Sequence, residues 1–235
     1  MTEPAASEPL EPAELERRGR TQFQDALDTL KADVDALGSM AAAAVAGAVA
    51  SLVGDDLASA TRVVAGDDGI DAWFLALEER AYALLAQQAP VASDLRFLIA
   101  ALRVMADYEK AGDRAVAVAK VALTEWEREP ATLRLLGRMG DLTLCLLDSA
   151  RRAWRDEDIV EARDLRRRDC ELDACYRRLT EHLMGQVGEG ATALAIHAHA
   201  AGRNLERIAD HAVMIGDRVS YLVTGDPSAL AAEIG

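Results

Sequence analysis

An internal duplication is the feature that most limits how this chain can fold. Three segments of the first half recur in the second half: Gly54–Leu57 at Asp156–Ile159, Asp67–Ala72 at Asp169–Ala174, and Glu109–Asp113 at Glu206–Asp210. The displacement is about 102 residues for the first two segments and about 97 residues for the third, so one connection is about five residues shorter in the second half. The chain therefore predicts two related structural units in tandem.

Each unit is expected to be helical. Aliphatic residues and alanine dominate, aromatic residues make up 4% of the chain, and the prolines number six, which is typical of a helical protein. Apolar residues recur at helical spacing between breaks at Gly54, Pro90, Pro130, Asp156 and Gly185–Gly190. We therefore predict an all-α fold of two tandem three-helix bundles, with six long helices in total. The expected boundaries are a disordered N-terminal tail over 1–18, a first repeat over 19–128, a second repeat over 129–225 and a C-terminal tail over 226–235.

Several helix ends carry local signals. The first helix is expected from about Thr21 to Val53. Pro90 is expected in the first turn of the third helix, and Asp156 is expected to cap the fifth. Gly225 is expected to close the sixth helix in the left-handed conformation.

Charge and cysteine content limit the partners and the compartment. The net charge of −14 argues against nucleic acid or anionic lipid as a partner, because both would repel the chain. The three cysteines form no Cys-x-x-Cys pair, which favours a reducing compartment. The segment Met1–Glu16 lacks the basic and apolar regions of a signal peptide. We therefore expect a cytoplasmic protein.

One stretch, Ala36–Gly54, carries no charged residue and is long enough to be considered as a membrane span. It is mostly alanine, acids flank it, and its larger residues recur at helical spacing: Leu37, Met40, Val45, Val49 and Leu52. A buried bundle helix is therefore favoured, without direct membrane insertion. Met40 and its counterpart Leu142 in the second repeat are both expected to be buried.

The duplicated segments contain four acidic steps. In each step two carboxylates lie one helical turn apart on one face: Asp67 with Asp71, Glu109 with Asp113, Asp169 with Asp173, and Glu206 with Asp210. In an antiparallel helical hairpin, residues equidistant from the turn face each other. Pro90 lies midway between the two steps of the first half, and Gly188–Gly190 lies midway between those of the second. The spacing therefore predicts one quartet of carboxylates in each half.

Each quartet is a candidate metal site. Four like charges at one level of a hairpin repel one another, and a hard divalent or trivalent cation with oxygen ligands would neutralise them. Magnesium, manganese and calcium are all compatible with such ligands. The alternative is a metal-free helical scaffold, in which the acids are solvated faces that dock basic partners.

Four segments form a recognisable combination: Leu77–Arg80, Gln88–Arg96, Asn204–Ala212 and Tyr221–Gly225. Together they resemble the PhoU family of phosphate-signalling accessory proteins, and the likeness runs from about Gly19 to Gly225. The resemblance implies two three-helix bundles with metal clusters, often of iron or zinc, held by Glu/Asp-x-x-x-Asp motifs. In this chain the motifs are Glu109 with Asp113 and Glu206 with Asp210, joined by Asp67 with Asp71 and Asp169 with Asp173 on the partnering helices.

The resemblance also implies a function. Proteins of the PhoU family report phosphate sufficiency and restrain both the phosphate-specific ABC transporter and a sensor histidine kinase. We therefore expect a negative regulator of phosphate uptake and of phosphate-starvation signalling. It would act as a metal-binding helical adaptor and as a homodimer, with components of the ABC transporter and the kinase as partners. No basic phosphate cradle is apparent in the sequence, so we expect phosphate to be sensed indirectly.

The first repeat departs from the family pattern at two positions. Tyr108 replaces a usual leucine and Arg114 replaces a usual histidine. A cation beside Asp113 is expected to weaken the first site. The second repeat keeps His211, which is expected on the helix surface or at a cap rather than as a ligand, because the acidic step already supplies the ligands.

A carboxylate-bridged di-metal enzyme of the ferritin-like type is a further alternative. Such enzymes place Glu-x-x-His steps inside the bundle core, and no histidine of this chain stands three residues after a glutamate. His182, His197 and His199 have no acid or cysteine at a repeating spacing, and are expected at the surface or the edge of the core. A non-enzymatic protein is therefore expected.

Overall fold

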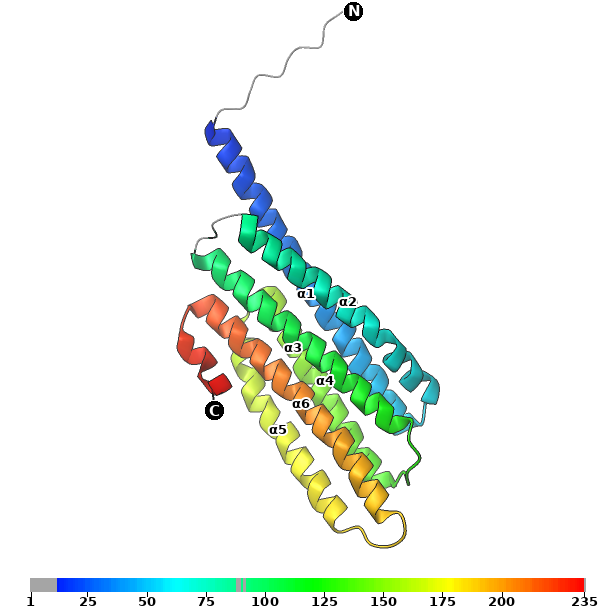
Figure 1. The fold of residues 1–235 in the computed structure, drawn as a ribbon. Helices are drawn as coiled ribbons and strands as arrows, with labels where there is room; N and C mark the ends of the chain where they lie inside the picture. The colour runs from blue at the N-terminus through cyan, green and yellow to red at the C-terminus, as the bar shows by residue number, and fades with distance from the viewer. Residues whose placement is uncertain (1–11, 88–89, 91, 235) are drawn as a thin grey trace, which may run out of the picture.

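The computed structural model describes residues 12–87, 90 and 92–234, and these residues form a helical protein (Figure 1). The elements in chain order are α1 (Pro12–Gly54), α2 (Leu57–Gln87), α3 (Ala92–Ala122), α4 (Pro130–Asp156), α5 (Ile159–Met184), α6 (Ala191–Thr224) and the short 3-10 helix η1 (Pro227–Ile234). No strand occurs within this described part of the chain. The predicted all-α fold with six long helices is confirmed.

The helices pack as two bundles joined side by side. In the first bundle α2 packs on α1 and α3, and in the second α5 packs on α4 and α6. The bundles meet where α3 packs against α6 and where α1 packs against α4, so α2 and α5 lie on opposite outer sides (Figure 1). The pairs α2–α3 and α5–α6 are antiparallel hairpins. This topology brings the acidic steps of each half onto facing helices.

The observed ends of α1 and η1 change the expected tails. Helix α1 begins at Pro12 rather than near Thr21, and its first turns extend beyond the other helices (Figure 1). Residues 12–18, predicted to be disordered, are therefore helical, and the acidic Glu14 in the first turn suits the positive end of the helix dipole. The rest of the predicted N-terminal tail lies outside the described residues. Most of the predicted C-terminal tail forms η1.

Three predicted caps have different outcomes. Gly225 closes α6 with φ +70° and donates its N–H to the Tyr221 carbonyl at 2.8 Å, as predicted. The N-cap of α5 is Asp158, not Asp156, because the Asp158 carboxylate accepts from the backbone N–H groups of residues 160 and 161 at 2.8 and 3.1 Å. Pro90 precedes α3, which begins at Ala92, so it is not a residue of the first turn.

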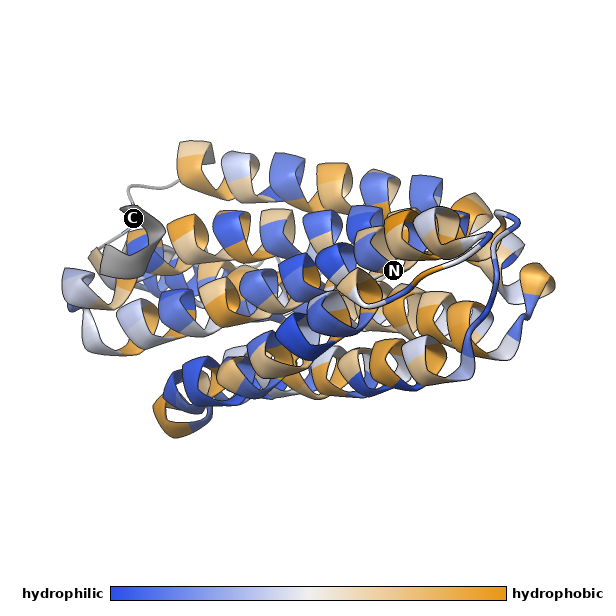
Figure 2. Ribbon diagram, turned by 90° about the horizontal axis from the view of Figure 1, so that it is seen from below, coloured by the Kyte–Doolittle hydropathy of each residue, from blue (hydrophilic) through white to orange (hydrophobic). Residues whose placement is uncertain are grey.

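The uncharged stretch of α1 belongs to the protein core. Within the described residues, Arg17–Gly54 is long and apolar enough to cross a bilayer, and 44% of its most apolar window is buried in this structure. Its fully buried residues recur at helical spacing: Leu30, Val34, Leu37, Ala41, Val45, Ala48 and Leu52. The hydropathy colouring in Figure 2 shows the corresponding alternation of apolar and hydrophilic segments along the helices. The stretch is thus a bundle helix in this fold.

The predicted burial of Met40 is wrong. Met40 is 36% exposed, and its counterpart Leu142 is only half-buried. Met40 lies off the buried face of α1 and borders an open groove between α1 and α2, which is also lined by Gly47, Gly66 and Ile70. The small residues leave this groove unfilled, so no core surrounds Met40.

Tyr108, one of the two departures from the family pattern, is a core residue. It is fully buried on α3 and packs on Gly38 of α1, where an added Cβ would lie 2.6 Å from the tyrosine ring. The larger ring thus fills space that glycine leaves open between the two helices.

The contact between the bundles depends on a second close approach. A Cβ at Gly140 of α4 would lie 2.4 Å from Cγ1 of Val49 on α1, whereas a Cβ at Gly137 would lie 3.5 Å from its nearest neighbour. We expect Gly140→Ala to lower the free energy of unfolding by about 1–3 kcal/mol through overpacking. Gly137→Ala should raise it by about 0.5–1 kcal/mol, since alanine favours a helix. Urea unfolding of both variants checks this, and equal shifts for the two would contradict the proposed packing.

Candidate metal centre

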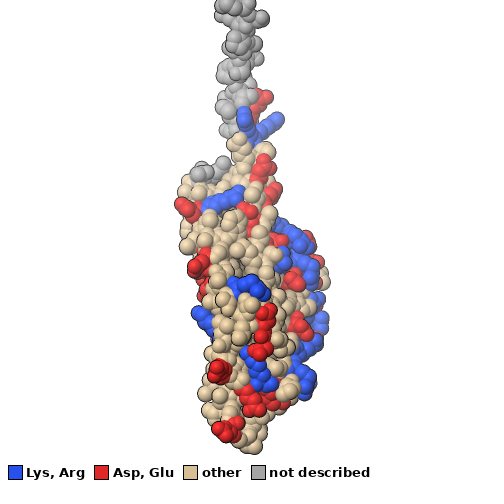
Figure 3. Space-filling view, turned by 90° about the vertical axis from the view of Figure 1, so that its right-hand side faces the viewer, with Lys and Arg blue, Asp and Glu red and all other residues tan. Residues whose placement is uncertain are grey.

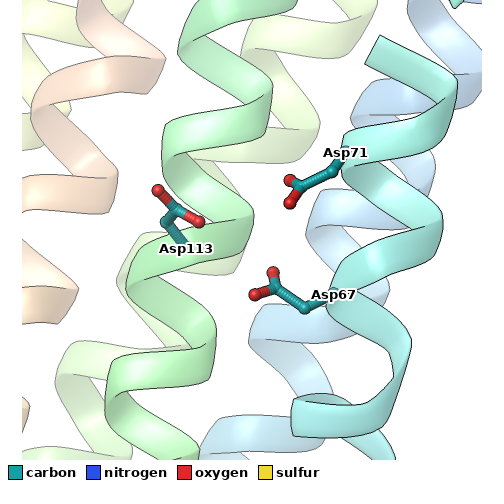
Figure 4. Close-up of side chains that lie close together, drawn as sticks. All are labelled: Asp67, Asp71 and Asp113. Carbon is teal, nitrogen blue, oxygen red and sulfur yellow. The ribbon is translucent and has the colours of Figure 1, made fainter. Parts of the chain in front are cut away.

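The first acidic cluster forms between α2 and α3. Asp67 and Asp71 project from α2 toward Asp113 on α3 (Figure 4), and one carboxylate oxygen of each lies within 4.8 Å of the others. Glu109 lies one turn before Asp113 on α3 and is not part of this group of three. Burial, followed by the charges of Asp113 and Asp71, raises the pKa of Glu109. All four predicted acids of this half therefore lie close enough together for their charges to interact.

The electrostatics of this cluster favour a cation. Burial, followed by the charges of Asp71 and Asp113, raises the pKa of Asp67. The Oδ1 atom of Asp67 is buried and accepts no hydrogen bond from the protein, although buried polar atoms are nearly always bonded. Within the described residues, no lysine or arginine forms an ion pair with Asp67, Asp71, Glu109 or Asp113. An ion with oxygen ligands fits this arrangement, because it would satisfy the buried oxygen and neutralise the repulsion.

The equivalent acids lie on α5 and α6, although within the described residues only the first cluster brings three carboxylate oxygens within 4.8 Å of one another. Asp169 and Asp173 lie on α5, and Glu206 and Asp210 lie on α6. Asp169 Oδ1 is also buried without a hydrogen-bond partner, at the position equivalent to Asp67. Burial, followed by the charges of Asp173, Asp210 and Glu206, raises the pKa of Asp169 to about 7. Each half thus contains one buried carboxylate oxygen that accepts no hydrogen bond from the protein.

The second cluster differs in its basic neighbours. Arg203 Nη1 donates to both carboxylate oxygens of Glu206, at 3.0 and 2.9 Å, and Arg207 Nη1 donates to Asp210 Oδ2 at 3.1 Å. Neither pair was predicted from the sequence, although each arginine precedes its acid by three residues, a spacing that favours ion pairs on a helix. Arg114, which was expected to weaken the first site, is exposed and forms no ion pair with Asp113 within the described structure.

His211 joins the two bundles. Its Nδ1 atom lies 3.0 Å from Oδ1 of Asp107 on α3, and Arg218 Nε donates to Asp107 Oδ2 at 2.9 Å. The side chain of His211 is only 13% exposed, so the expected location on the helix surface or at a cap is wrong. The sequence does not indicate this contact, because α3 and α6 belong to different repeats.

The raised pKa of Asp169 predicts a pH-dependent stability. The ordinary aspartate pKa is about 3.9. Because the pKa of Asp169 in the folded protein is well above this value, folding disfavours the ionised form of its side chain. The stability that the protonated form contributes is therefore lost as the pH rises from about 4 to 7. With chelator present, Asp169→Asn should raise the melting temperature more at pH 8 than at pH 5. Glu171→Gln, at an exposed position on the same helix, is the matched control, because Glu171 is not among the groups that raise the pKa of Asp169. The same gain at both pH values would contradict this account.

The fold and the two clusters define a duplicated helical-bundle protein with one carboxylate cluster in each repeat. Residues 34–122 and 136–219 both match the family model of the PhoU domain. The chain therefore belongs to the PhoU family, as the sequence resemblance indicated. Proteins of this family are accessory and regulatory proteins rather than enzymes, which excludes the ferritin-like alternative.

Individual relatives match along most of their length. The "Phosphate-specific transport system accessory protein PhoU homolog 1" of Mycobacterium tuberculosis is 33% identical over 209 residues, covering 88% of this chain and 95% of the relative. The PhoU homolog of Caulobacter vibrioides is 33% identical over 208 residues, covering 87% and 90%. The crystal structure of PhoU from Pseudomonas aeruginosa has a TM-score of 0.80 at 29% identity, covering 87% of this chain and all of the other. The Streptococcus pneumoniae PhoU structure has a TM-score of 0.81 at 27% identity, covering 87% and 98%.

Proposed function

We propose that this protein is an accessory regulator of phosphate transport. The observation that carries the proposal is the relationship to PhoU proteins over both repeats. The relatives are named as accessory proteins of the phosphate-specific transport system, and an all-helical bundle without enzymatic chemistry suits an adaptor. In this role the protein restrains phosphate uptake and phosphate-starvation signalling in the cytoplasm. Its partners would be components of the phosphate ABC transporter and a sensor histidine kinase, and its assembly a homodimer.

We further propose that the two acidic clusters bind metal ions. The first cluster would use Asp67, Asp71 and Asp113 with Glu109 beside them, and the second would use the four equivalent acids. The buried, unbonded oxygens of Asp67 and Asp169 support this proposal. A bound ion would neutralise each cluster and link the two helices that carry it. The family resemblance favours iron or zinc, and the all-oxygen ligand set is also compatible with magnesium, manganese or calcium.

The metal-free scaffold is the competing interpretation. It assigns the acids to docking surfaces for basic partners. On the face shown in Figure 3, however, acidic and basic side chains are interspersed rather than gathered in one acidic surface. The burial of Asp67 Oδ1 and Asp169 Oδ1 also argues against freely solvated clusters. The metal proposal is therefore preferred.

Deletion of the gene tests the regulatory proposal. We expect a strain without this protein to express phosphate-starvation genes in phosphate-rich medium, because the restraint on signalling is lost. The measurement is reporter expression at high and low phosphate, in a strain that has no second copy of the gene. Restoring the wild-type gene should restore repression. Normal repression in the deletion strain would contradict the proposed function.

A further inference from the structure

The two acidic clusters differ in the cations that already contact them. No lysine or arginine in the described structure forms an ion pair with the first cluster. In the second, Arg203 contacts both oxygens of Glu206. Arg207 contacts Asp210 at 3.1 Å, and its Nε atom lies 3.9 Å from Glu206 Oε2. Both α6 acids of the second cluster are thus paired with an arginine within the protein.

We infer that Arg203 and Arg207 are internal counter-ions of the second cluster, which binds a metal ion only in exchange for their guanidinium groups. The first cluster then binds metal more tightly, and metal loading releases two arginines on α6. This inference rests on the metal-binding function proposed above.

The exchange follows from competition for the same oxygens. Both carboxylate oxygens of Glu206 already accept hydrogen bonds from Arg203, and its side chain is only 15% exposed. A guanidinium and a metal ion held at the same carboxylate would repel each other at short range. The arginines can leave without any movement of the helix, because their side chains are 44% and 47% exposed.

The first repeat provides an internal comparison. The positions equivalent to Arg203 and Arg207 carry Ala106 and Lys110. Ala106 has no charge, and Lys110 is exposed and forms no ion pair with Glu109 in the described structure. Lys110 does lower the pKa of Glu109 by its charge. It therefore acts on its cluster through charge alone, whereas Arg207 forms a direct bond.

The test isolates the second cluster and uses Mn²⁺ as the probe. In an Asp67→Ala/Asp71→Ala protein, only the second cluster is complete, and free Mn²⁺ is followed by its paramagnetic resonance signal during titration. Adding Arg203→Ala and Arg207→Ala should tighten binding by roughly three- to thirtyfold, the range expected when two exposed ion pairs no longer compete. Unchanged affinity would overturn the inference.

The matched control measures the effect of charge removal alone. In a Glu206→Ala/Asp210→Ala protein, only the first cluster is complete, and Lys110→Ala should tighten Mn²⁺ binding by less than about threefold, since no direct ion pair is lost. If Lys110→Ala increased Mn²⁺ affinity as much as the two arginine substitutions or more, long-range charge alone would explain the arginine effect, and the proposed exchange would be overturned.

A second readout follows the arginines in the wild-type protein. Reaction of Arg203 and Arg207 with phenylglyoxal, measured by mass spectrometry, should be faster with Mn²⁺ than with chelator, while the exposed Arg20 reacts at one rate. Unchanged rates at Arg203 and Arg207 in Mn²⁺-loaded protein would overturn the inference. Failure of the wild type and of both single-cluster proteins to bind Mn²⁺ would instead overturn the metal-binding proposal, and the inference with it.

Discussion

Asp107→Ala is expected to destabilise the protein by about 3–5 kcal/mol, the cost of breaking a buried ion pair. Asp107 is 2% exposed and contacts His211 and Arg218 of the other repeat. The side chain of Arg218 is itself only 9% exposed, so its charge would remain in a poorly solvated site without this carboxylate. At about 2–4 °C per kcal/mol for a protein of this size, the melting temperature should fall by roughly 10 °C.

Two further variants identify the cause of this loss. Asp156→Ala removes a carboxylate that is paired with Arg155 at an exposed position, and it should change stability by less than about 1 kcal/mol. Asp107→Leu combined with Arg218→Met should recover much of the stability, because apolar replacements of buried pairs are often neutral. If Asp107→Ala cost no more than Asp156→Ala, the contact between α3 and α6 would not depend on this group of charges.

The fold was largely predictable because each helix carries its own signals. Apolar periodicity, prolines and glycines delimit the helices locally, and the duplication fixes their order. The errors arose where local signals are weak. Three acids occur within the segment Asp156–Asp158, so sequence alone does not identify the one that caps α5. In the alanine-rich part of α1 the side chains differ little in size, which left the rotation of the helix undetermined and led to the wrong burial of Met40.

The acidic clusters were predictable for a different reason. Two steps equidistant from the turn of an antiparallel hairpin lie at the same level, and they face each other if the rotation of both helices allows it. The structure has this arrangement at Asp67, Asp71 and Asp113. The contact of Asp107 with His211 was not predictable, because it depends on how the two bundles pack. The pairing of Arg203 and Arg207 is visible in the sequence, because each arginine precedes its acid by three residues on one helix. Arg114 is the basic residue adjacent in sequence to an acidic step, but it forms no ion pair with Asp113 within the described structure.

Removing one α3 or α6 acidic step should abolish metal binding at its cluster. Glu109→Ala/Asp113→Ala and Glu206→Ala/Asp210→Ala should each lower the bound metal, measured by elemental analysis of protein purified without a nickel column. Neither change should harm the metal-free fold, since each removes repulsion between carboxylates. The sequence alone favours the second cluster as the stronger site because of Arg114. The arginine pairs at Glu206 and Asp210 favour the first cluster instead. At limiting metal, the variant that lacks the stronger site should lose more bound metal, which distinguishes the two expectations.

Stability measurements provide an independent test of the same variants. Free metal at about 100 times its dissociation constant stabilises a protein by about 2.7 kcal/mol, so chelator should lower the melting temperature of the wild type by roughly 5–10 °C. Each double variant should respond less, because one cluster no longer binds. Asp68→Ala/Glu171→Ala removes two exposed acids beside the clusters and should respond like the wild type. Unchanged metal content and an unchanged chelator response in both cluster variants would show that the acids are solvated, and the metal-free scaffold would then be the better account of this protein.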